Sequence, residues 1–364
     1  MKKFSMLVHK WLGLVLSLWL LLITLTGTIL LYKNHFLEWQ YPQLAGQAGA
    51  SAEQAVQVLQ LDSVSAVAEY SFLPTELHPW IEVIDKSGGR LYFSQRGELL
   101  VERGKYADWI SWFTEFHHHL LLDNLGEELQ GVLGLLAILV FITGLIKWWP
   151  KGKFSKRDFG ITWSRPGKKK WGQTLWQTHR TFGVILFLPM LLLIVTGVGM
   201  IYSSAFNSGL NYLFPEKSKK IVDHANTILE QNNKASHLPA DWQTRIKQVT
   251  EILPEASTIM VYHQRDKLRL RQPEEWHPNG RSYLSFNPDS SEVLSVTDYR
   301  NETVGTQLAQ KIYPLHIASV GGNGYLILIT LSGIILGWIC VSGSWFWYWC
   351  YRKKSAAKKR KKSC

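Results

Sequence analysis

The chain has 364 residues, of which 46% are hydrophobic, 13% aromatic and only 19% charged, and long apolar runs alternate with polar stretches. This composition argues against an ordinary soluble enzyme. The formal net charge of +12 suggests nucleic acid, but the basic residues flank the apolar runs, and the basic tail has no interleaved aromatic after Tyr351, so we expect no nucleic-acid binding.

Four apolar runs are each long enough to cross the hydrocarbon core of a membrane, which takes about 20 residues of helix. They cover residues 12–32, 129–149, 182–203 and 325–351. The first run is too long for a signal peptide and lacks a small-residue cleavage site, so we interpret it as a retained span. Pro189 lies within the third run, where we expect it to kink the helix.

The distribution of basic residues predicts the orientation of these spans. Residues 1–10, 147–180 and 351–364 contain 21 of the 40 Lys and Arg residues and a single acidic residue, Asp158. The positive-inside rule therefore places both termini and the 150–178 loop in the cytoplasm. The two long polar segments, 33–116 and 204–315, then lie outside.

Each polar segment is predicted to begin with a helix and to continue in β-strands. In the first, residues 51–60 resemble a short helix, and strands at 80–84 and 90–94 flank a Lys86-Ser-Gly-Gly turn. In the second, residues 240–252 are helical in pattern. Four strands are expected there, at residues 258–263, 268–271, 282–286 and 293–297. We therefore expect two α+β lobes.

The chain contains an internal repeat. Residues 9–32 and 179–202 align without a gap and are identical at 9 of 24 positions, including a His, a Gly four residues later and a Thr-Gly pair. In the other two runs, His117 precedes Gly144, and His316 precedes Gly343, by the same 27 residues. We predict a tandem duplication in which the order span, lobe, histidine, span, basic segment occurs twice.

This topology pairs the four histidines that the repeat aligns. His9 and His179 begin outward-running helices at the cytoplasmic face, whereas His117 and His316 precede inward-running helices at the outer face. An imidazole on each side of a flat macrocycle is what a six-coordinate b-type haem requires. Because the chain has no CxxCH motif, we predict two non-covalently held haem b groups, one in each leaflet.

Several alternatives stay open. His118 or His119 can replace His117 as the outer ligand, because consecutive helical residues point in different directions. Zinc binding and proton relay are rival roles for the four histidines, although two histidines per layer without a nearby carboxylate or thiol make a poor zinc site. Six further histidines are interpreted as surface residues: His35, His78, His224, His237, His263 and His277.

Two glycines lie close to the inner histidines in the sequence. Gly13 and Gly183 follow His9 and His179 by four residues, on the same face of each helix. A missing side chain there allows a porphyrin or a neighbouring helix to approach closely. We therefore include both as candidate close-approach residues.

Five motifs resemble the PepSY-associated transmembrane family, which includes iron-regulated inner-membrane proteins and siderophore reductases. They are His9-Lys-Trp-Leu-Gly, Phe116-His-His-His-Leu-Leu-Leu, Thr143-Gly-Leu-Ile-Lys-Trp-Trp-Pro, His179-Arg-Thr-Phe-Gly and Tyr313-Pro-Leu-His. The resemblance covers all four apolar runs and, more loosely, both lobes as PepSY-like domains. The sequence departs from the family pattern at His118 and His119, where a basic and a small residue are expected.

The resemblance implies an integral membrane α-helical protein with four transmembrane helices and two extracytoplasmic PepSY-like lobes. The first half is expected to comprise helix 1 (1–32), lobe 1 (33–116), the outer histidine with helix 2 (117–149) and the cytoplasmic loop (150–178). The second half comprises helix 3 (179–203), lobe 2 (204–315), the outer histidine with helix 4 (316–351) and the basic tail (352–364). The lipid bilayer is its first partner, and a bacterial inner membrane its expected location.

The implied activity is reduction of a periplasmic acceptor, most simply Fe(III) in a ferric siderophore or another iron chelate, by electrons that cross the membrane. A quinol or a cytoplasmic protein is the expected electron donor, since no flavin or nicotinamide fingerprint is present. Two alternatives are a non-redox protein whose lobes bind or inhibit a periplasmic peptidase, and a haem b quinol-linked subunit of another enzyme. Five lobe residues are candidates for contacting the chelate: Trp80, Tyr92, Tyr262, Arg269 and Arg271.

Overall fold

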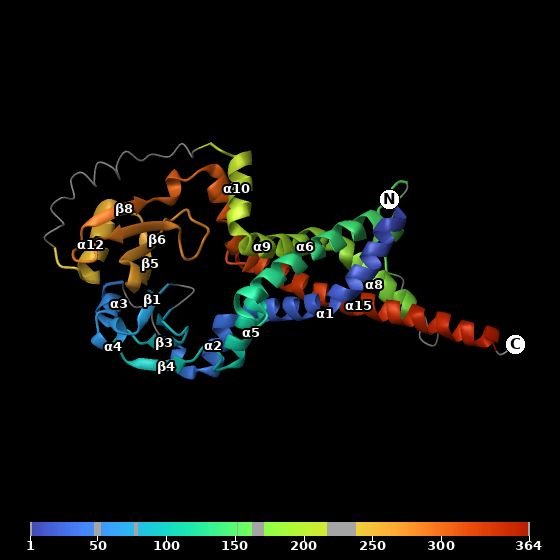
Figure 1. The fold of residues 1–364 in the computed structure, drawn as a ribbon, viewed down its shortest axis with the longest axis horizontal. Helices are drawn as coiled ribbons and strands as arrows, with labels where there is room; N and C mark the ends of the chain where they lie inside the picture. Colours follow the sequence, from blue (N-terminus) through green and yellow to red (C-terminus); the bar gives the residue numbers. More distant parts are fainter. Residues whose placement is uncertain are drawn as a thin grey trace. The chain divides into compact units, whose positions relative to one another are not determined.

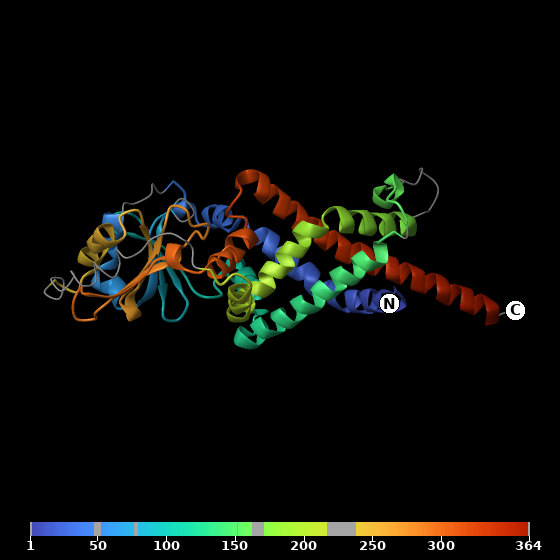
Figure 2. The same cartoon turned by 90° about the horizontal axis from the view of Figure 1, so that it is seen from above.

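The computed structural model describes residues 2–46, 52–75, 79–150, 152–161, 171–216 and 238–362. The chain divides into two compact units whose segments alternate along the sequence. The membrane unit comprises Met1–Leu31, Phe113–Tyr202 and Val320–Cys364, and the sheet unit comprises Tyr32–Trp112 and Ser203–Ser319. Figures 1 and 2 show the helices and strands of both.

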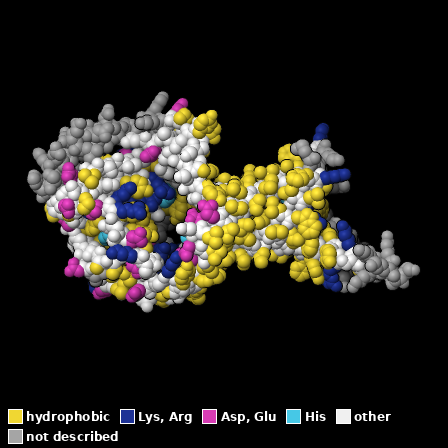
Figure 3. All heavy atoms as spheres, viewed as in Figure 1, with side chains coloured by type: hydrophobic (Ala, Val, Ile, Leu, Met, Phe, Trp, Pro, Cys, Tyr) yellow, Lys and Arg dark blue, Asp and Glu magenta, His cyan; other side chains and the backbone are white. Residues whose placement is uncertain are grey.

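The membrane unit is built from apolar helices. Among the described residues, three are long and apolar enough to cross a membrane: α1 (Lys2–Leu30), α6 (Asp123–Trp148) and α15 (Gly322–Lys362). The helices α8 (Trp171–Ile185) and α9 (Phe187–Ile201) meet at a bend of 70° and make a fourth candidate if they form one span. A short helix, α7 (Lys156–Phe159), precedes α8. Hydrophobic side chains cover the visible face of this unit, as lipid contact requires (Figure 3).

The bend between α8 and α9 confirms the kink expected at Pro189. Proline has no N–H, and its ring clashes with the carbonyl of the residue four positions earlier. That residue is Ile185, where α8 ends, and the break falls at Leu186. The sequence pattern predicts that the third apolar run begins at residue 182, whereas the helix begins at Trp171.

Among the described residues, the strands of the sheet unit form one eight-stranded antiparallel sheet with the order β4-β3-β2-β1-β5-β6-β7-β8. The strands of the first polar segment are β1 (Ala68–Phe72), β2 (Ile81–Asp85), β3 (Arg90–Phe93) and β4 (Leu99–Arg103). Those of the second are β5 (Ser257–Tyr262), β6 (Lys267–Arg271), β7 (Ser282–Phe286) and β8 (Val293–Thr297). The strands of the two predicted lobes thus join at the β1–β5 pair.

Helices and short 3₁₀ turns complete the sheet unit. Two helices precede the first strands of the two halves, α3 (Ala52–Leu59) and α12 (Trp242–Ile252), and α4 (Asp62–Ser65) follows α3. The remaining helices are α2 (Lys33–Gln40), α5 (Trp109–His119, which continues into the membrane unit), α10 (Ser203–Leu213), α13 (Val304–Ala309) and α14 (Ile312–His316). The 3₁₀ turns are η1 (Pro42–Leu44), η3 (His263–Arg265) and η4 (Tyr299–Asn301).

Most predicted elements of the polar segments are confirmed. Local signals explain why: Asp241 caps α12 through Thr244 N–H at 2.8 Å, and Asp85 accepts from Gly89 N–H at 2.9 Å in the β2–β3 turn. The strands β1 and β4 were not predicted. Both carry charged residues within five-residue segments, which obscures the alternation that marks a strand.

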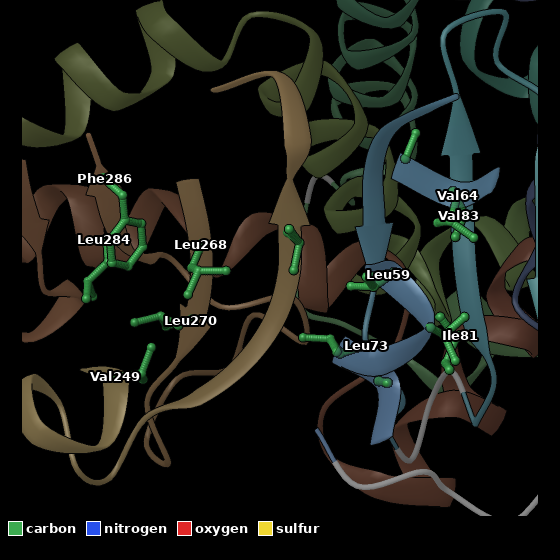
Figure 4. Packing of buried hydrophobic residues seen from close by; sticks show 14 of the residues in the cluster. Leu59, Val64, Leu73, Ile81, Val83, Val249, Leu268, Leu270, Leu284 and Phe286 are labelled. Carbon is green, nitrogen blue, oxygen red and sulfur yellow. The ribbon is translucent and has the colours of Figure 1, made fainter. Parts of the chain in front are cut away.

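The main hydrophobic core lies between the sheet and the helices α3 and α12. It joins Leu59 of α3 and Val249 of α12 to strand residues from both halves, including Val83 and Leu268 (Figure 4). Because side chains alternate across a strand, the intervening residues of β1 and β5 point to the opposite face of the sheet. That face is therefore left for other contacts.

A second buried cluster surrounds an ion pair. Arg103 donates to both carboxylate oxygens of Asp108, at 2.6 and 2.9 Å, and also to the Tyr92 hydroxyl at 2.8 Å. Burial raises the pKa of Asp108, but hydrogen bonds from Arg103 and the Ser111 N–H outweigh it and lower the pKa to about 2. Trp80 and Tyr92 are 1% and 0% exposed, so their predicted role as chelate contacts is wrong.

Candidate functional site

His9 and His179 lie together in the membrane unit. Their ring centroids are 6.2 Å apart, and the ring planes meet at 73°. His9 is held by α1 and His179 by α8, the shorter arm of the bent helix pair. The structure therefore brings together the two histidines that the repeat predicts as a pair.

Each of the two rings is anchored through Nδ1 to a backbone carbonyl. His9 Nδ1 donates to Val140 O of α6 at 3.0 Å, and His179 Nδ1 donates to Ile339 O of α15 at 3.0 Å. A carbonyl only accepts hydrogen bonds, so the proton must reside on Nδ1. The tautomer leaves the lone pair on Nε2, which is the form in which histidine binds a metal.

A glycine lies against each ring. A Cβ added at Gly144 would lie 2.8 Å from His9 Cε1, and one at Gly343 would lie 2.9 Å from His179 Cε1. These glycines follow Thr143 and Ser342, whose hydroxyls donate to the same two carbonyls, Val140 O at 3.0 Å and Ile339 O at 3.3 Å. The Thr-Gly or Ser-Gly pair of one helix thus forms a cradle for the histidine of another.

The separation of the inner pair would allow the two imidazoles to hold one metal between them. An imidazole nitrogen bonds a first-row metal at about 2.1 Å and lies about 1 Å from its ring centre, so opposed ligands have centroids about 6 Å apart. Ordinary edge-to-face ring pairs also have this separation. The anchored Nδ1 atoms are compatible with metal binding, because the tautomer that they fix has its lone pair on Nε2. Residues present here therefore fit a bis-histidine haem.

His117 has the same environment in the first half of the chain. Its Nδ1 lies 3.1 Å from Ile23 O and 3.2 Å from Thr26 Oγ1, and a Cβ at Gly27 would lie 2.7 Å from its Cε1. His119 Nδ1 instead pairs with Glu115 at 3.3 Å. The cradle therefore favours His117 over His119 as the outer ligand. His118 contacts both neighbouring rings, with centroids 5.8 Å away.

The backbone after these histidines is strained. Leu120, Leu121 and Asp123 all have positive φ, between 48° and 61°, which non-glycine residues rarely adopt. Gln130 of α6 donates to His117 O at 2.7 Å and accepts from Trp19 Nε1 at 2.7 Å, so the end of α5 is tied to α1 and α6. Strain that the surroundings maintain is typical of functional sites.

His316 is the last residue of α14, in the sheet unit. Its pairing with His117 rests on the repeat and stays a prediction. Among the described residues, no group of three or more His, Cys, Asp or Glu side chains is placed to hold a metal ion. A haem iron takes only two ligands from the protein, so the two-histidine arrangement is a separate case.

The two predicted close-approach glycines have ordinary neighbours. A Cβ at Gly13 would meet Val140 at 3.5 Å, and one at Gly183 would meet Ile339 at 3.8 Å, both normal contact distances. Neighbouring helices therefore do not require glycine there, and the close approach of a porphyrin stays a prediction. The sequence contains the Thr-Gly pairs in register, but their role as cradles was missed, because it depends on contacts between helices.

One lobe histidine is buried. His277 is only 4% exposed and stacks on Tyr313, with centroids 4.8 Å apart, so the prediction that it is a surface residue is wrong. His263 is partly exposed, and its Nε2 lies 2.9 Å from Ser71 Oγ. His78, His224 and His237 lie outside the described residues.

Comparison with known families identifies the chain. A family model described as the PepSY-associated TM region matches residues 6–349. The chain belongs to this family. The match confirms the resemblance seen in the histidine and Thr-Gly motifs, and with the apolar helices it identifies a membrane protein. No curated protein matches the chain in sequence.

Proposed function

We propose that this PepSY-associated membrane protein carries two haem b groups and passes electrons across a bacterial inner membrane to reduce Fe(III) in a periplasmic chelate, most simply a ferric siderophore. The observation that carries the proposal is the inner pair. His9 and His179 lie 6.2 Å apart, and both Nδ1 atoms are bound to carbonyls. Paired neutral imidazoles of this kind suit a low-spin haem.

In this proposal the protein has four transmembrane helices, which form a tandem repeat, and both termini are cytoplasmic. The bent pair α8–α9 is then the third span. The sheet supports the duplication, because register irregularities recur at equivalent places: in β1–β2 and β5–β6, and again in β3–β4 and β7–β8. The clustering of Lys and Arg in three segments supports the orientation.

Each ligand has a stated role. His9 and His179 would hold the inner haem, and His117 and His316 the outer one. Haem iron supplies one-electron exchange between Fe(III) and Fe(II). The carbonyls of Val140, Ile339 and Ile23 fix the Nδ1 protons, which orients the rings and makes each Nε2 a better ligand.

The overall reaction needs an electron donor. One quinol gives two electrons and two protons, so its oxidation to a quinone reduces two Fe(III) to two Fe(II). An apolar groove of about 420 Å³ between α1 and α15 supports a lipid-soluble quinol over a cytoplasmic protein. Ser344 lines it beside Gly343, and its Oγ has no hydrogen-bond partner among the described residues. Fe(II) binds hard oxygen ligands less tightly than Fe(III), so reduction frees the metal.

The test follows electrons from the protein to iron. Purified protein is reduced with dithionite, freed of excess reductant and mixed with a ferric tricatecholate in the presence of an Fe(II) indicator. We expect the reduced haem bands to fade as Fe(II) forms in equal amount. In a second assay a quinol supplies the electrons. His9→Ala should prevent the protein from passing electrons from the quinol to the chelate, whereas His35→Ala, on the exposed face of α2, should not. Stable reduced bands with no Fe(II) would contradict the proposal.

Two alternative functions give different results in the same experiment. A peptidase-binding protein would be colourless and form no Fe(II). A haem subunit of another enzyme would have the bands but would need its partner before iron is reduced.

A further inference from the structure

The sheet unit contains a pocket where its two halves meet. Its volume is about 380 Å³, which is within the range of small-ligand sites, about 300–1,000 Å³. Tyr70 and Phe72 of β1 and Tyr262 of β5 form one wall. These strands pair directly, with Tyr70 opposite Tyr262. The pocket therefore lies on the sheet face that α3 and α12 leave open.

The aromatic wall presents ring surfaces to the pocket. The centroids of Tyr70 and Tyr262 are 6.0 Å apart with a tilt of 38°, and Tyr70 meets Phe72 at 6.0 Å edge to face. None of the three rings is fully buried. Partly exposed aromatic rings in a concave site are suited to stacking on a planar ligand ring.

A buried guanidinium contributes charge to the same pocket. Arg269 is 8% exposed, and its Nε donates to Gly280 O at 2.9 Å. Its Nη1 lies 3.8 Å from the Met260 sulfur, and its Nη2 is buried with no hydrogen-bond partner among the described residues. A buried N–H of a cation that lacks an acceptor is costly and favours a ligand that supplies an acceptor oxygen.

Two further charges lie at the pocket. Arg265 is exposed on η3 and adds a second cation, whereas Glu69 is an exposed carboxylate of β1. The lining therefore has a net positive charge, with one acidic group that opposes it. Lys and Arg side chains gather on one face of the sheet unit (Figure 3). This charge favours an anionic ligand, and Glu69 provides a control of opposite sign.

A series of contacts connects the pocket to the helix that ends at His316. Asn279 lines the pocket, and Gly280 N–H donates to His277 O at 2.9 Å. The His277 ring stacks on Tyr313 with a plane angle of 16°, three residues before His316 in α14. All the residues that make these contacts belong to the sheet unit. The loop that contains His277 and Gly280 therefore connects the pocket to the helix that carries His316, the proposed outer haem ligand.

This loop is rigid. Both carboxylate oxygens of Glu275 accept backbone N–H groups, from Gln272 at 2.7 Å and from Arg281 at 2.9 Å. Gly280 has φ +67° and lies against β6, where a Cβ would clash with the Leu270 carbonyl. Burial and the neighbouring Arg side chains lower the pKa of His277 to about 2, so this ring stays neutral and stacked at physiological pH.

We propose that this pocket binds the ferric chelate that the protein reduces, and that it selects anionic chelates with catechol rings over neutral hydroxamate chelates. The inference rests on the proposed function, because it names the substrate class of that reaction. A catecholate arm combines a planar ring, which Tyr70 and Tyr262 stack on, with negative oxygens, which Arg265 and Arg269 attract. A neutral hydroxamate chelate offers neither feature.

Binding is tested with gallium chelates and the full-length protein in detergent. Ga(III) copies the charge and shape of Fe(III) complexes but is not reduced, so binding is measured apart from electron transfer. We expect the Ga(III) complex of a hexadentate tricatecholate to bind at least tenfold more tightly than the neutral Ga(III) trihydroxamate. Calorimetry at low and high salt gives both affinities.

Four variants locate the site. Arg265→Gln and Arg269→Gln should each weaken tricatecholate binding, by about fivefold and about tenfold or more, whereas Glu69→Gln should strengthen it about twofold at low salt. The control is Arg96→Gln, an equal loss of charge at an exposed turn outside the pocket, which should leave binding unchanged. Arg265 and Glu69 are exposed, so both tests remain valid even if Arg269→Gln misfolds.

Equal affinity for the two gallium complexes, or tricatecholate binding that is insensitive to Arg265→Gln and Glu69→Gln, would overturn the inference. Failure of the proposed function looks different. A haem-free protein that still binds the tricatecholate through this pocket would refute the electron-transfer proposal and retain the site. A haem-loaded protein that binds neither chelate would refute the site and retain electron transfer.

Discussion

At the scale of single residues, three histidines occupy the same kind of cradle. His9, His117 and His179 each direct Nδ1 to a carbonyl four residues before a glycine, and that glycine lies against the ring. A polar ring within apolar helices is costly unless it is hydrogen-bonded. The cradle satisfies Nδ1, and in the proposed function the other ring nitrogen binds the haem iron, which would account for the repetition of His and Thr-Gly together.

A methyl group at the cradle glycine tests this arrangement. Gly144→Ala should displace the His9 ring, because the new Cβ would lie 2.8 Å from Cε1, and should remove about one of the two haems. Haem per chain, measured as the pyridine haemochrome, checks this. Gly324→Ala, in the membrane-unit helix α15, is the matched control, since an added Cβ there meets nothing within 4 Å. Equal haem loss in both variants would refute the cradle.

The buried Asp108–Arg103 pair predicts a dependence of stability on pH. The pKa of Asp108 falls from 3.8 to about 2 on folding, so its ionised form stabilises the fold by about 2 kcal/mol. This stabilisation is fully present above about pH 4 and is lost as the pH falls towards 2. Asp108→Asn should remove this pH dependence and destabilise the sheet unit by about 3–5 kcal/mol, because Arg103 loses its partner.

Circular dichroism of thermal unfolding between pH 2 and 5 measures the effect. Parallel curves for the wild type and the variant over this range would show that the pair does not carry the acid sensitivity.

At the scale of elements, the helices are tied together by polar groups within apolar surroundings. Gln130 of α6 is buried and bridges Trp19 of α1 to the carbonyl of His117 at the end of α5. The three positive-φ residues that follow need such a restraint. The position of His117 therefore depends on α6 as well as on α1.

Gln130→Leu removes this bridge while keeping a similar side-chain volume. The partly buried Trp19 indole N–H and His117 carbonyl both lose their partner, which costs up to about 1–3 kcal/mol each and frees the end of α5. We expect the midpoint potential of one haem, the outer one, to shift in a redox titration while the other stays constant. Gln177→Leu, on α8, provides a comparison near the inner pair. A uniform shift of both potentials would contradict the local role of Gln130.

Sequence predicted the elements better than their assembly. The four apolar runs, six of the eight strands and the His9–His179 pair follow from periodicity, charge and repeat register. The single sheet does not, because β1 and β5 pair across nearly two hundred residues with no local signal. The buried states of Trp80, Tyr92 and His277 were also missed, since burial depends on which elements pack together.

At the scale of the whole molecule, the basic segments predict a definite orientation. Alkaline phosphatase fused after Gly104 should be active, and the same enzyme at the C-terminus should be inactive, because only the first lies outside the cytoplasm. A cytoplasm-dependent fluorescent protein should be fluorescent when it is fused to the C-terminus and dark when it is fused after Gly104. Activity of the C-terminal phosphatase fusion would contradict the four-span topology.

In the proposed function the protein holds two haem b groups, one at each membrane face. A dithionite-reduced minus oxidised optical spectrum of the purified protein, with a pyridine haemochrome count, measures this directly. We expect low-spin b-type bands from two haems per chain, and about one after either His9→Ala or His316→Ala. A colourless protein from haem-sufficient cells would contradict this expectation.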